Sequence, residues 1–214
     1  MSTPLVVIGA GGFGRETLDV VEAVNRAASE PIFDLLGVID ASPSAENIAR
    51  LAAREVAYLG TEISWLQANR CAKYLIGIGN PTVRERVDQE LSAAGLVAAT
   101  AVHPSATVGS AVTIDVGTII CGGVQVSTNV TIGRHVQLNP SVTIGHDCVL
   151  NDFVSVNPAA TISGEVILGM RSLIGAGAVV LQGLALGADA LVGASACVVR
   201  NVESSRTVKG VPAR

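Results

Sequence analysis

The sequence of 214 residues has few aromatic and few charged side chains, which make up 3% and 15% of the chain. A core of aromatic layers is therefore excluded, and the hydrophobic content of 49% must come mostly from aliphatic residues and alanine. This composition suits many thin, similar layers better than one bulky core. Basic residues are not in surplus either, because the net charge is −4. We expect no nucleic-acid partner, since binding to phosphates needs positive charge.

The sequence also has no long apolar run and no CxxC pair of cysteines, and we expect no leader peptide. Its suspicious uncharged stretch, residues 172–188, contains four glycines and is shorter than the roughly 20 apolar residues of a membrane-spanning helix. No basic segment precedes the first apolar run, as it would in a signal peptide. The four cysteines form no CxxC pair, which favours reduced thiols. We therefore expect a cytoplasmic protein with no membrane partner.

The charged residues divide the chain into two parts. Residues 1–95 hold 20 of the 32 charged residues, and the other 12 are spread over residues 96–214. In the first part, short apolar runs alternate with segments of helical periodicity. We expect strands at residues 5–8, 35–39 and 74–78, and helices at residues 15–28 and 82–94. This alternation predicts a small parallel sheet with helices on its faces.

The second part is a repeat of hexapeptides. An aliphatic residue recurs at every sixth position from Val102 to Val198, without an insertion. Glycine or asparagine often stands where a tight turn would need it. The pattern predicts a solenoid of short strands whose aliphatic side chains fill a narrow core. We expect two domains, at residues 1–100 and 101–214.

Motifs along the whole chain narrow the assignment. They are VIGAGGFG at residues 7–14, GIGNPTVR at 77–84, HPSA at 103–106, GHDC at 145–148 and VKGVPAR at 208–214. Together with the repeat, they resemble the hexapeptide-repeat acyltransferases of the PglD/NeuD type. The resemblance implies a Rossmann-like α/β domain followed by a left-handed parallel β-helix with three hexapeptides per coil. It also implies a homotrimeric enzyme that acetylates a sugar with acetyl-CoA.

The resemblance implies catalytic roles for His146 and Asp147. A histidine has a pKa near neutral pH and suits a general base, and Asp147 is the neighbouring acid. With three hexapeptides per coil, Gly164 falls beside His146 and can turn its N–H toward the thioester oxygen. Ser155 departs from the family pattern, since many members carry a second histidine there. A hydroxyl can still donate a hydrogen bond to the acyl group, but it cannot carry charge.

Contacts with the two substrates also follow from the resemblance. Acetyl-CoA is expected along the solenoid between subunits, against Ser155, Gly164, Gly175, Ala176, Ala194, Lys209 and Pro212. The nucleotide-linked sugar is expected against Gly9, Gly11, Gly12, Asp40, Asn80 and Asn139. The glycine-rich loop follows a strand and precedes a helix, which suits a diphosphate at the helix N-terminus. The first part is too short for a full dinucleotide-binding domain beside a catalytic domain.

Three alternatives stay open beside transfer to the amine of a nucleotide-linked amino sugar. The acceptor could be a hydroxyl of sialic acid or of another sugar. A zinc enzyme of the γ-type carbonic anhydrases shares the solenoid, but His103, His135 and His146 lack that family's spacing, and we expect no metal. Of these, His103 and His135 are expected to be structural or exposed, with His135 on an outer turn. The third alternative is a non-catalytic nucleotide-binding scaffold, for which Ser155 is the only support.

Overall fold

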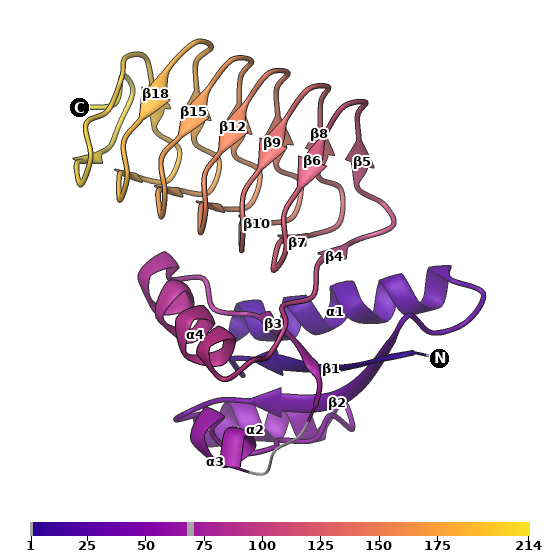
Figure 1. Cartoon of the computed structure of the whole chain (residues 1–214). Helices are drawn as coiled ribbons and strands as arrows, with labels where there is room; N and C mark the ends of the chain where they lie inside the picture. Colours follow the sequence, from indigo (N-terminus) through magenta and orange to yellow (C-terminus); the bar gives the residue numbers. More distant parts are fainter. Residues whose placement is uncertain (1, 68–70) are drawn as a thin grey trace.

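A parallel sheet of three strands forms the first part of the molecule. The computed structural model describes residues 2–67 and 71–214, and Figure 1 shows the sheet below a solenoid. The strands are β1 (Thr3–Ile8), β2 (Phe33–Ile39) and β3 (Lys73–Ile76), in the order β2–β1–β3. Residues 5–8 of the central β1 are fully buried, as expected where both faces of a sheet are covered. The three predicted strands are confirmed, with slightly shifted ends.

Helices cover both faces of this sheet. They are α1 (Gly12–Ala27), α2 (Ala45–Ala52), α3 (Glu62–Gln67) and α4 (Pro81–Ala93). The predicted helices at residues 15–28 and 82–94 are confirmed as α1 and α4. The sequence did not predict α2 and α3, because these helices are too short to show a helical period. Within the described ranges, no helix has the length and apolar character that crossing a membrane requires.

The second part is a parallel solenoid of very short strands in three sheets (Figure 1). Sheet 1 contains β4 (Ala101–Val102), β7 (Ile119–Ile120), β10 (Gln137–Leu138), β13 (Ser155–Val156), β16 (Leu173–Ile174), β19 (Leu191–Val192) and β21 (Thr207–Val208). Sheet 2 contains β5 (Thr107–Val108), β8 (Gln125–Val126), β11 (Thr143–Ile144), β14 (Thr161–Ile162), β17 (Val179–Val180) and β20 (Cys197–Val198). Sheet 3 contains β6 (Thr113–Ile114), β9 (Thr131–Ile132), β12 (Val149–Leu150), β15 (Ile167–Leu168) and β18 (Ala185–Leu186).

The strand register confirms the predicted coil of three hexapeptides. Ile120 pairs with Leu138, and Leu138 pairs with Val156, so that neighbours in a sheet lie three hexapeptides apart. The second residue of most strands points inward and is buried, which fills the core with valine, isoleucine and leucine. The last pairing in sheet 1 spans a shorter segment, because Leu191 pairs with Thr207. Positions one coil apart therefore form columns along the outside of the solenoid.

The α/β part packs on sheet 1 and on the turn before it. Gln137 donates from Nε2 to the Ile76 carbonyl (2.8 Å), and the Ser155 hydroxyl donates to the Gly79 carbonyl (3.1 Å). Arg84 of α4 is fully buried between the two parts. It donates to the backbone oxygens of Ile78, Gly79, His135, Phe153 and Val154 and to the side chains of Gln137 and Ser155.

His135 is also part of this contact, and the expected outer position was wrong. Its side chain is fully buried and stacks between the rings of Tyr74 and Phe153, with centroid distances of 6.0 and 5.4 Å. Nε2 lies 2.7 Å from Oδ1 of Asp88 on α4. The turn before sheet 1 faces the α/β part, and the sequence pattern within the solenoid could not reveal this. Of the two roles expected for His135, structural or exposed, the structure shows the structural one.

Candidate functional site

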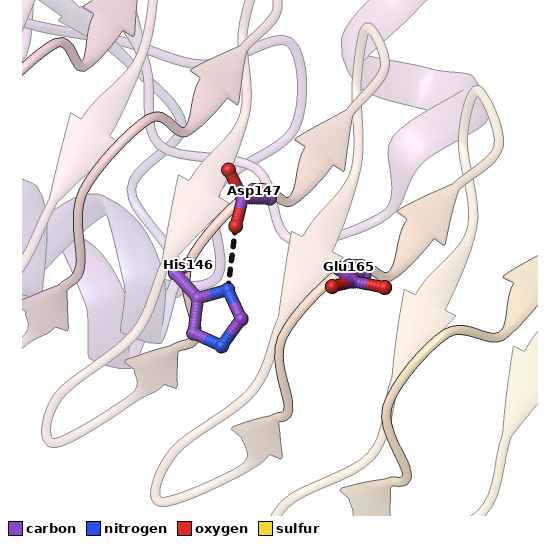
Figure 2. A group of neighbouring side chains, drawn as sticks. All are labelled: His146, Asp147 and Glu165. Atoms are coloured by element: carbon purple, nitrogen blue, oxygen red, sulfur yellow. Dashed lines mark hydrogen bonds and ion pairs between the residues drawn. The ribbon is translucent and has the colours of Figure 1, made fainter.

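The candidate catalytic pair lies on the turn between β11 and β12, at the corner of sheets 2 and 3. His146 and Asp147 are consecutive, so on a strand their side chains would point to opposite faces. Asp147 instead has a φ of 59°, a left-handed conformation that asparagine and aspartate tolerate. Both side chains therefore project from the same corner, and Figure 2 shows them side by side. His146 Nδ1 lies 2.6 Å from Asp147 Oδ2.

A second hydrogen bond holds the carboxylate of Asp147. Asn129, one coil earlier, donates from Nδ2 to Asp147 Oδ1 (2.5 Å). The hydrogen bonds from Asn129 and His146, in that order, lower the pKa of Asp147 below its ordinary value. Asp147 is therefore a carboxylate at neutral pH and accepts a hydrogen bond from the Nδ1–H of His146. In this tautomer Nε2 carries a lone pair and can accept a proton.

Gly164 lies directly beneath the imidazole of His146. A Cβ at this position would be 2.6 Å from both Cε1 and Nε2 of His146, so any side chain would displace the ring. The backbone of the same turn is tied to His146, because Glu165 N donates to its carbonyl oxygen (2.8 Å). The stacking of residue 164 on residue 146, predicted from the length of one coil, is confirmed.

Glu165 extends the group of polar side chains at this corner. One ligand-type atom each of His146, Asp147 and Glu165 lies within 4.8 Å of the other two, and all three side chains are exposed (Figure 2). These residues could together contact a divalent cation. Because the hydrogen bond to Asp147 already uses Nδ1 of His146, a cation would have to bind Nε2 or displace this hydrogen bond.

The carboxyl edge of the three-stranded sheet gathers five predicted sugar-binding residues: Gly9, Gly11, Gly12, Asp40 and Asn80. Gly9 follows β1 with a φ of 105°, and a Cβ on Gly14 would lie 1.8 Å from its carbonyl oxygen. The loop therefore needs both glycines to enter α1. A Cβ on Gly11 or on Gly12 would meet no described atom within 4 Å, so this part of the loop faces open space.

Asp40 and Asn80 at the same edge already hold backbone groups. Asp40 accepts from Ala10 N (2.7 Å) through Oδ2, which fixes the glycine-rich loop against β2. Asn80 is the N-cap of α4 and accepts from Val83 N (3.1 Å), an ordinary role for asparagine. The sequence did not single out Arg15, whose Nη1 donates to the Ala10 carbonyl (2.9 Å) and is beside the loop.

The remaining predicted residues lie mostly at another corner, between sheets 1 and 2. Asn139, which follows β10, donates from Nδ2 to the Asn157 side chain (3.1 Å). Considering described residues only, its Oδ1 is buried and has no hydrogen-bond partner. Gly175 packs on the next coil, where a Cβ would be 2.5 Å from Ala194 N. The same column of turns holds Ala176, Ala194 and, after β21, Lys209.

The C-terminal tail closes this column. Lys209 N donates to the Arg214 carbonyl, and Arg214 N donates to the Lys209 carbonyl, both at 3.1 Å. Pro212 lies in the turn between them. The tail therefore brings Lys209 and Pro212 to the end of the corner between sheets 1 and 2, where the predicted cofactor residues Gly175 and Ala194 are found.

The geometry does not support direct cofactor contact by Ser155. Its side chain is 2% exposed, and its hydroxyl accepts from Arg84 Nη2 (2.9 Å) while it donates to the Gly79 carbonyl (3.1 Å). Ser155 stands half a coil after His146, so it falls on sheet 1, far around the coil from the imidazole. A serine fits here because the hydroxyl joins the solenoid to the α/β part of its own chain.

Two residues that matter most to this geometry were missed by sequence reasoning. Asn129 stands one coil before Asp147, so the stacking rule could have found it. Arg84 lies in the GIGNPTVR motif, but nothing in the sequence indicates that it is buried against residues of the distant solenoid turns. Within one chain, sheet 2 separates the corner of His146 from the corner of Asn139 and Gly175.

Comparisons with known proteins find that the chain is similar to sugar acetyltransferases. Residues 4–91 match the family model described as PglD N-terminal domain. The GDP-perosamine N-acetyltransferase of Escherichia coli O157:H7 is 33% identical over 154 residues, which are 70% of this chain and 65% of that protein. The chain thus spans less than two thirds of the length of this curated relative.

Solved structures match along the whole chain. PerB from Caulobacter crescentus, in complex with CoA and GDP-perosamine, is 28% identical with a TM-score of 0.86, covering 99% of this chain and 96% of that one. The acetyltransferase domain of PglB from Neisseria gonorrhoeae is 26% identical with a TM-score of 0.85, covering 100% and 99%. These matches confirm the predicted fold class, an α/β domain followed by a left-handed parallel β-helix.

Proposed function

We propose that the chain is a member of the PglD/NeuD-type hexapeptide-repeat sugar acetyltransferases, to which it is similar in sequence and fold, and that it uses acetyl-CoA to acetylate the amino group of a nucleotide-linked amino sugar. The observation that carries the proposal is the pair of His146 and Asp147 above Gly164, within a fold that matches sugar N-acetyltransferases over its full length. PerB has been solved with CoA and GDP-perosamine, which supports both substrate classes.

The chemistry follows from the tautomer of His146. The sugar amine attacks the thioester carbonyl, and His146 Nε2 takes the proton that the amine loses as the N–C bond forms. When the C–S bond breaks, the proton passes to the leaving thiolate, and the products are an amide and CoA. Asp147 stabilises the imidazolium that exists between these steps. The backbone N–H of Gly164, beside the imidazole, would stabilise the negative charge that develops on the thioester oxygen.

We assign nucleotide binding to residues 1–100 and acetyl transfer to residues 101–214. The carboxyl edge of the sheet offers Gly11 and Gly12 at the start of α1, where free N–H groups favour a diphosphate. Asp40 and Asn80 flank this loop. Asn139 contributes toward the sugar, because its Oδ1, buried and without a partner among the described residues, can accept a hydrogen bond from the amine. The amine of the sugar has hydrogens that it can donate to this oxygen, whereas an ether oxygen has none.

The proposed site needs a second copy of the chain. His146 is at the corner of sheets 2 and 3, but the α/β part packs on sheet 1, so the solenoid stands between them. We propose that His146 of one chain acts beside the Asn139 and Gly175 corner of its neighbour in a homotrimer. Leu181 and Val199 support this arrangement, since they stack one coil apart beside the His146 corner with 42% and 44% exposure and offer an apolar contact.

Acetyl-CoA would then lie between two solenoids, along Gly175, Ala176 and Ala194, with Lys209 and Pro212 toward its adenosine end. Small residues let the cofactor approach the backbone closely. The location that we propose is the cytoplasm, which the four free cysteines of the chain support.

The test is release of CoA thiol with a panel of acceptors, followed by mass spectrometry of the products. The panel contains GDP-perosamine, UDP- and dTDP-linked amino sugars, and free sialic acids. We expect turnover on a nucleotide-linked amino sugar. Turnover on hydroxyl acceptors alone would move the protein to O-acetylation, and failure of every acceptor would contradict the proposal. Stoichiometric zinc, with activity lost on its removal, would favour the carbonic anhydrase alternative instead.

A further inference from the structure

The proposed reaction gives Asn129 no role, although this residue forms a hydrogen bond with Asp147. Asn129 stands on the turn between β8 and β9, one coil before the catalytic pair. Its Nδ2 donates to Oδ1 of Asp147 (2.5 Å), while Oδ2 of the same carboxylate faces Nδ1 of His146 (2.6 Å). Each carboxylate oxygen therefore has one donor, and the two donors come from different coils.

The backbone explains why the two side chains meet. Asn129 and Asp147 have φ values of 58° and 59°, and their turns are joined because Asp147 N donates to the Thr128 carbonyl (3.1 Å). Equal backbone conformations on stacked turns send both side chains outward in parallel, one strand spacing apart. Asparagine tolerates the left-handed conformation and carries the donor that a carboxylate needs. An aspartate at the same position would offer only acceptors.

We propose that Asn129 is a positioning residue that acts through Asp147 to set the tautomer and orientation of His146. This inference rests on the proposed function for its kinetic consequence, but the effect on the imidazole stands without it. An exposed carboxylate with a single hydrogen bond can rotate toward water. With Oδ1 held by Asn129, Oδ2 stays in line with Nδ1–H of His146, which keeps Nε2 free as the base.

Glu165 does not serve the same purpose. It is stacked on the other side of Asp147 (Figure 2), and its carboxylate is an acceptor that can offer no donor to Asp147. The orientation of the pair thus depends on the coil before it rather than on the coil after it. Asn129 touches neither the reacting atoms nor a substrate in this arrangement, so its effect must be transmitted by Asp147.

The test replaces Asn129 by glycine, which suits a positive φ and removes the amide. Asn129→Asp serves as a second variant of equal size in which the donor becomes an acceptor. The matched control is Ala111→Gly, one coil earlier on the same corner, where φ is 55° and the side chain has no polar atom. We expect both Asn129 variants to lower kcat about tenfold, the loss of one hydrogen bond to a charged group. KM for acetyl-CoA and the control should not change.

A readout without turnover separates this inference from the proposed function. The ¹⁵N chemical shifts of the His146 ring report which nitrogen carries the proton. We expect the Nδ1–H form in the wild-type protein and a shift toward the Nε2–H form in Asn129→Gly, but not in Ala111→Gly. An unchanged tautomer in Asn129→Gly would overturn the inference, whether or not the protein acetylates sugars.

A double-mutant cycle checks the route of the effect. In an Asp147→Gly background, Asn129→Gly should leave kcat unchanged, because the residue through which it acts is gone. An equal loss of kcat in both backgrounds would contradict action through Asp147. If the wild-type protein acetylates no acceptor, the proposed function fails, and the tautomer measurement still decides on Asn129.

Discussion

At the scale of single residues, the proposed catalytic corner depends on the absence of a side chain at Gly164 as much as on the imidazole of His146. The imidazole rests on the Gly164 backbone, and the space between them is smaller than a methyl group needs. His146 and Asp147 are both exposed in the isolated chain, so packing does not hold the ring. Its orientation depends on Asp147 and on the absence of a side chain at Gly164.

Gly164→Ala should therefore lower kcat with little loss of stability. A Cβ 2.6 Å from two ring atoms must displace the imidazole from its position, and we expect about a tenfold or larger loss of kcat. The melting temperature should stay close to that of the wild type, since the ring can move into solvent. Gly122→Ala is the control, because a Cβ there meets its nearest atom at 3.4 Å. Full activity of Gly164→Ala would contradict the assigned ring position.

The contacts between stacked residues at the two solenoid corners were largely predictable from the sequence. The period of one coil places Gly164 beside His146 and Asn157 beside Asn139, and both contacts are present. Ser155 was not predictable in the same way. Its surroundings are set by the α/β part, and a period within the solenoid contains no information about which sheet that part covers.

At the scale of elements, α4 is the main connection between the two parts. Arg84 inserts a guanidinium among carbonyl oxygens of the solenoid turns, and its burial lowers its pKa to about 9. The group is still charged at neutral pH, where its hydrogen bonds to carbonyl oxygens compensate for burial. Asp88, one turn further on, contacts the buried His135 and the hydroxyl of Tyr74.

Arg84→Met should destabilise the protein strongly. The substitution keeps an apolar stem but leaves several buried carbonyl oxygens without a donor, at a cost on the order of 3 kcal/mol in the free energy of unfolding. Arg86→Met is the matched control on the same helix. Arg86 forms an exposed ion pair with Glu90 at 3.8 Å, so the control should change stability by less than about 0.5 kcal/mol. Equal denaturation midpoints for the two variants would contradict the role of Arg84.

The lowered pKa of Asp88 predicts that the free energy of unfolding depends on pH. Burial alone would raise the pKa of Asp88, but hydrogen bonds from His135 and Tyr74 outweigh burial and lower it below 3.8. A carboxyl group with a lowered pKa in the folded state stabilises the protein above its unfolded pKa, and this contribution is lost as the pH falls further.

Asp88→Asn should thus be less stable than the wild type at pH 7, and the difference should shrink below about pH 4. Urea unfolding at a series of pH values measures this difference. Asp34→Asn, on the exposed side of β2, is the control. A difference that stays constant across the pH series would show that Asp88 contributes by shape and not by charge.

The elements themselves were predictable where a pattern repeats and not where contacts are distant. The solenoid strands β4–β20, together with β1–β3, α1 and α4, follow from the sequence pattern, whereas β21 lies beyond the last predicted repeat position. The docking of α4 on the solenoid does not follow from it, because Arg84 and Ser155 lie far apart in the sequence and a period within one segment carries no information about its contacts with another. The burial of His135 follows from this docking and was missed for the same reason.

At the scale of the whole molecule, the two halves of the proposed site lie on different corners of one solenoid. A shared site between copies predicts that two inactive chains restore activity when they assemble together. His146→Ala lacks the base, and Asn139→Ala lacks the proposed sugar contact at the other corner. In a trimer that contains both chains, about a third of the sites join an intact His146 to an intact Asn139.

Co-expression of the two chains with different affinity tags, followed by purification through both tags, gives these mixed assemblies. We expect thiol release from acetyl-CoA in the mixed assemblies and none in either variant alone. Mixed assemblies that are as inactive as the single variants would indicate a site within one chain. That result would contradict the proposed arrangement, although not the proposed reaction.

The measurement that tests the central claim most directly is the mass of the product formed from one matched pair of acceptors. The pair consists of the most active amino-sugar acceptor and its counterpart with a hydroxyl in place of the amine, each incubated with acetyl-CoA and either wild-type protein or His146→Ala. The account predicts one added acetyl group on the amine with the wild type, and a rate at least about 100-fold lower with the variant. Acetylation of the hydroxyl instead, or equal rates for the two proteins, would contradict it.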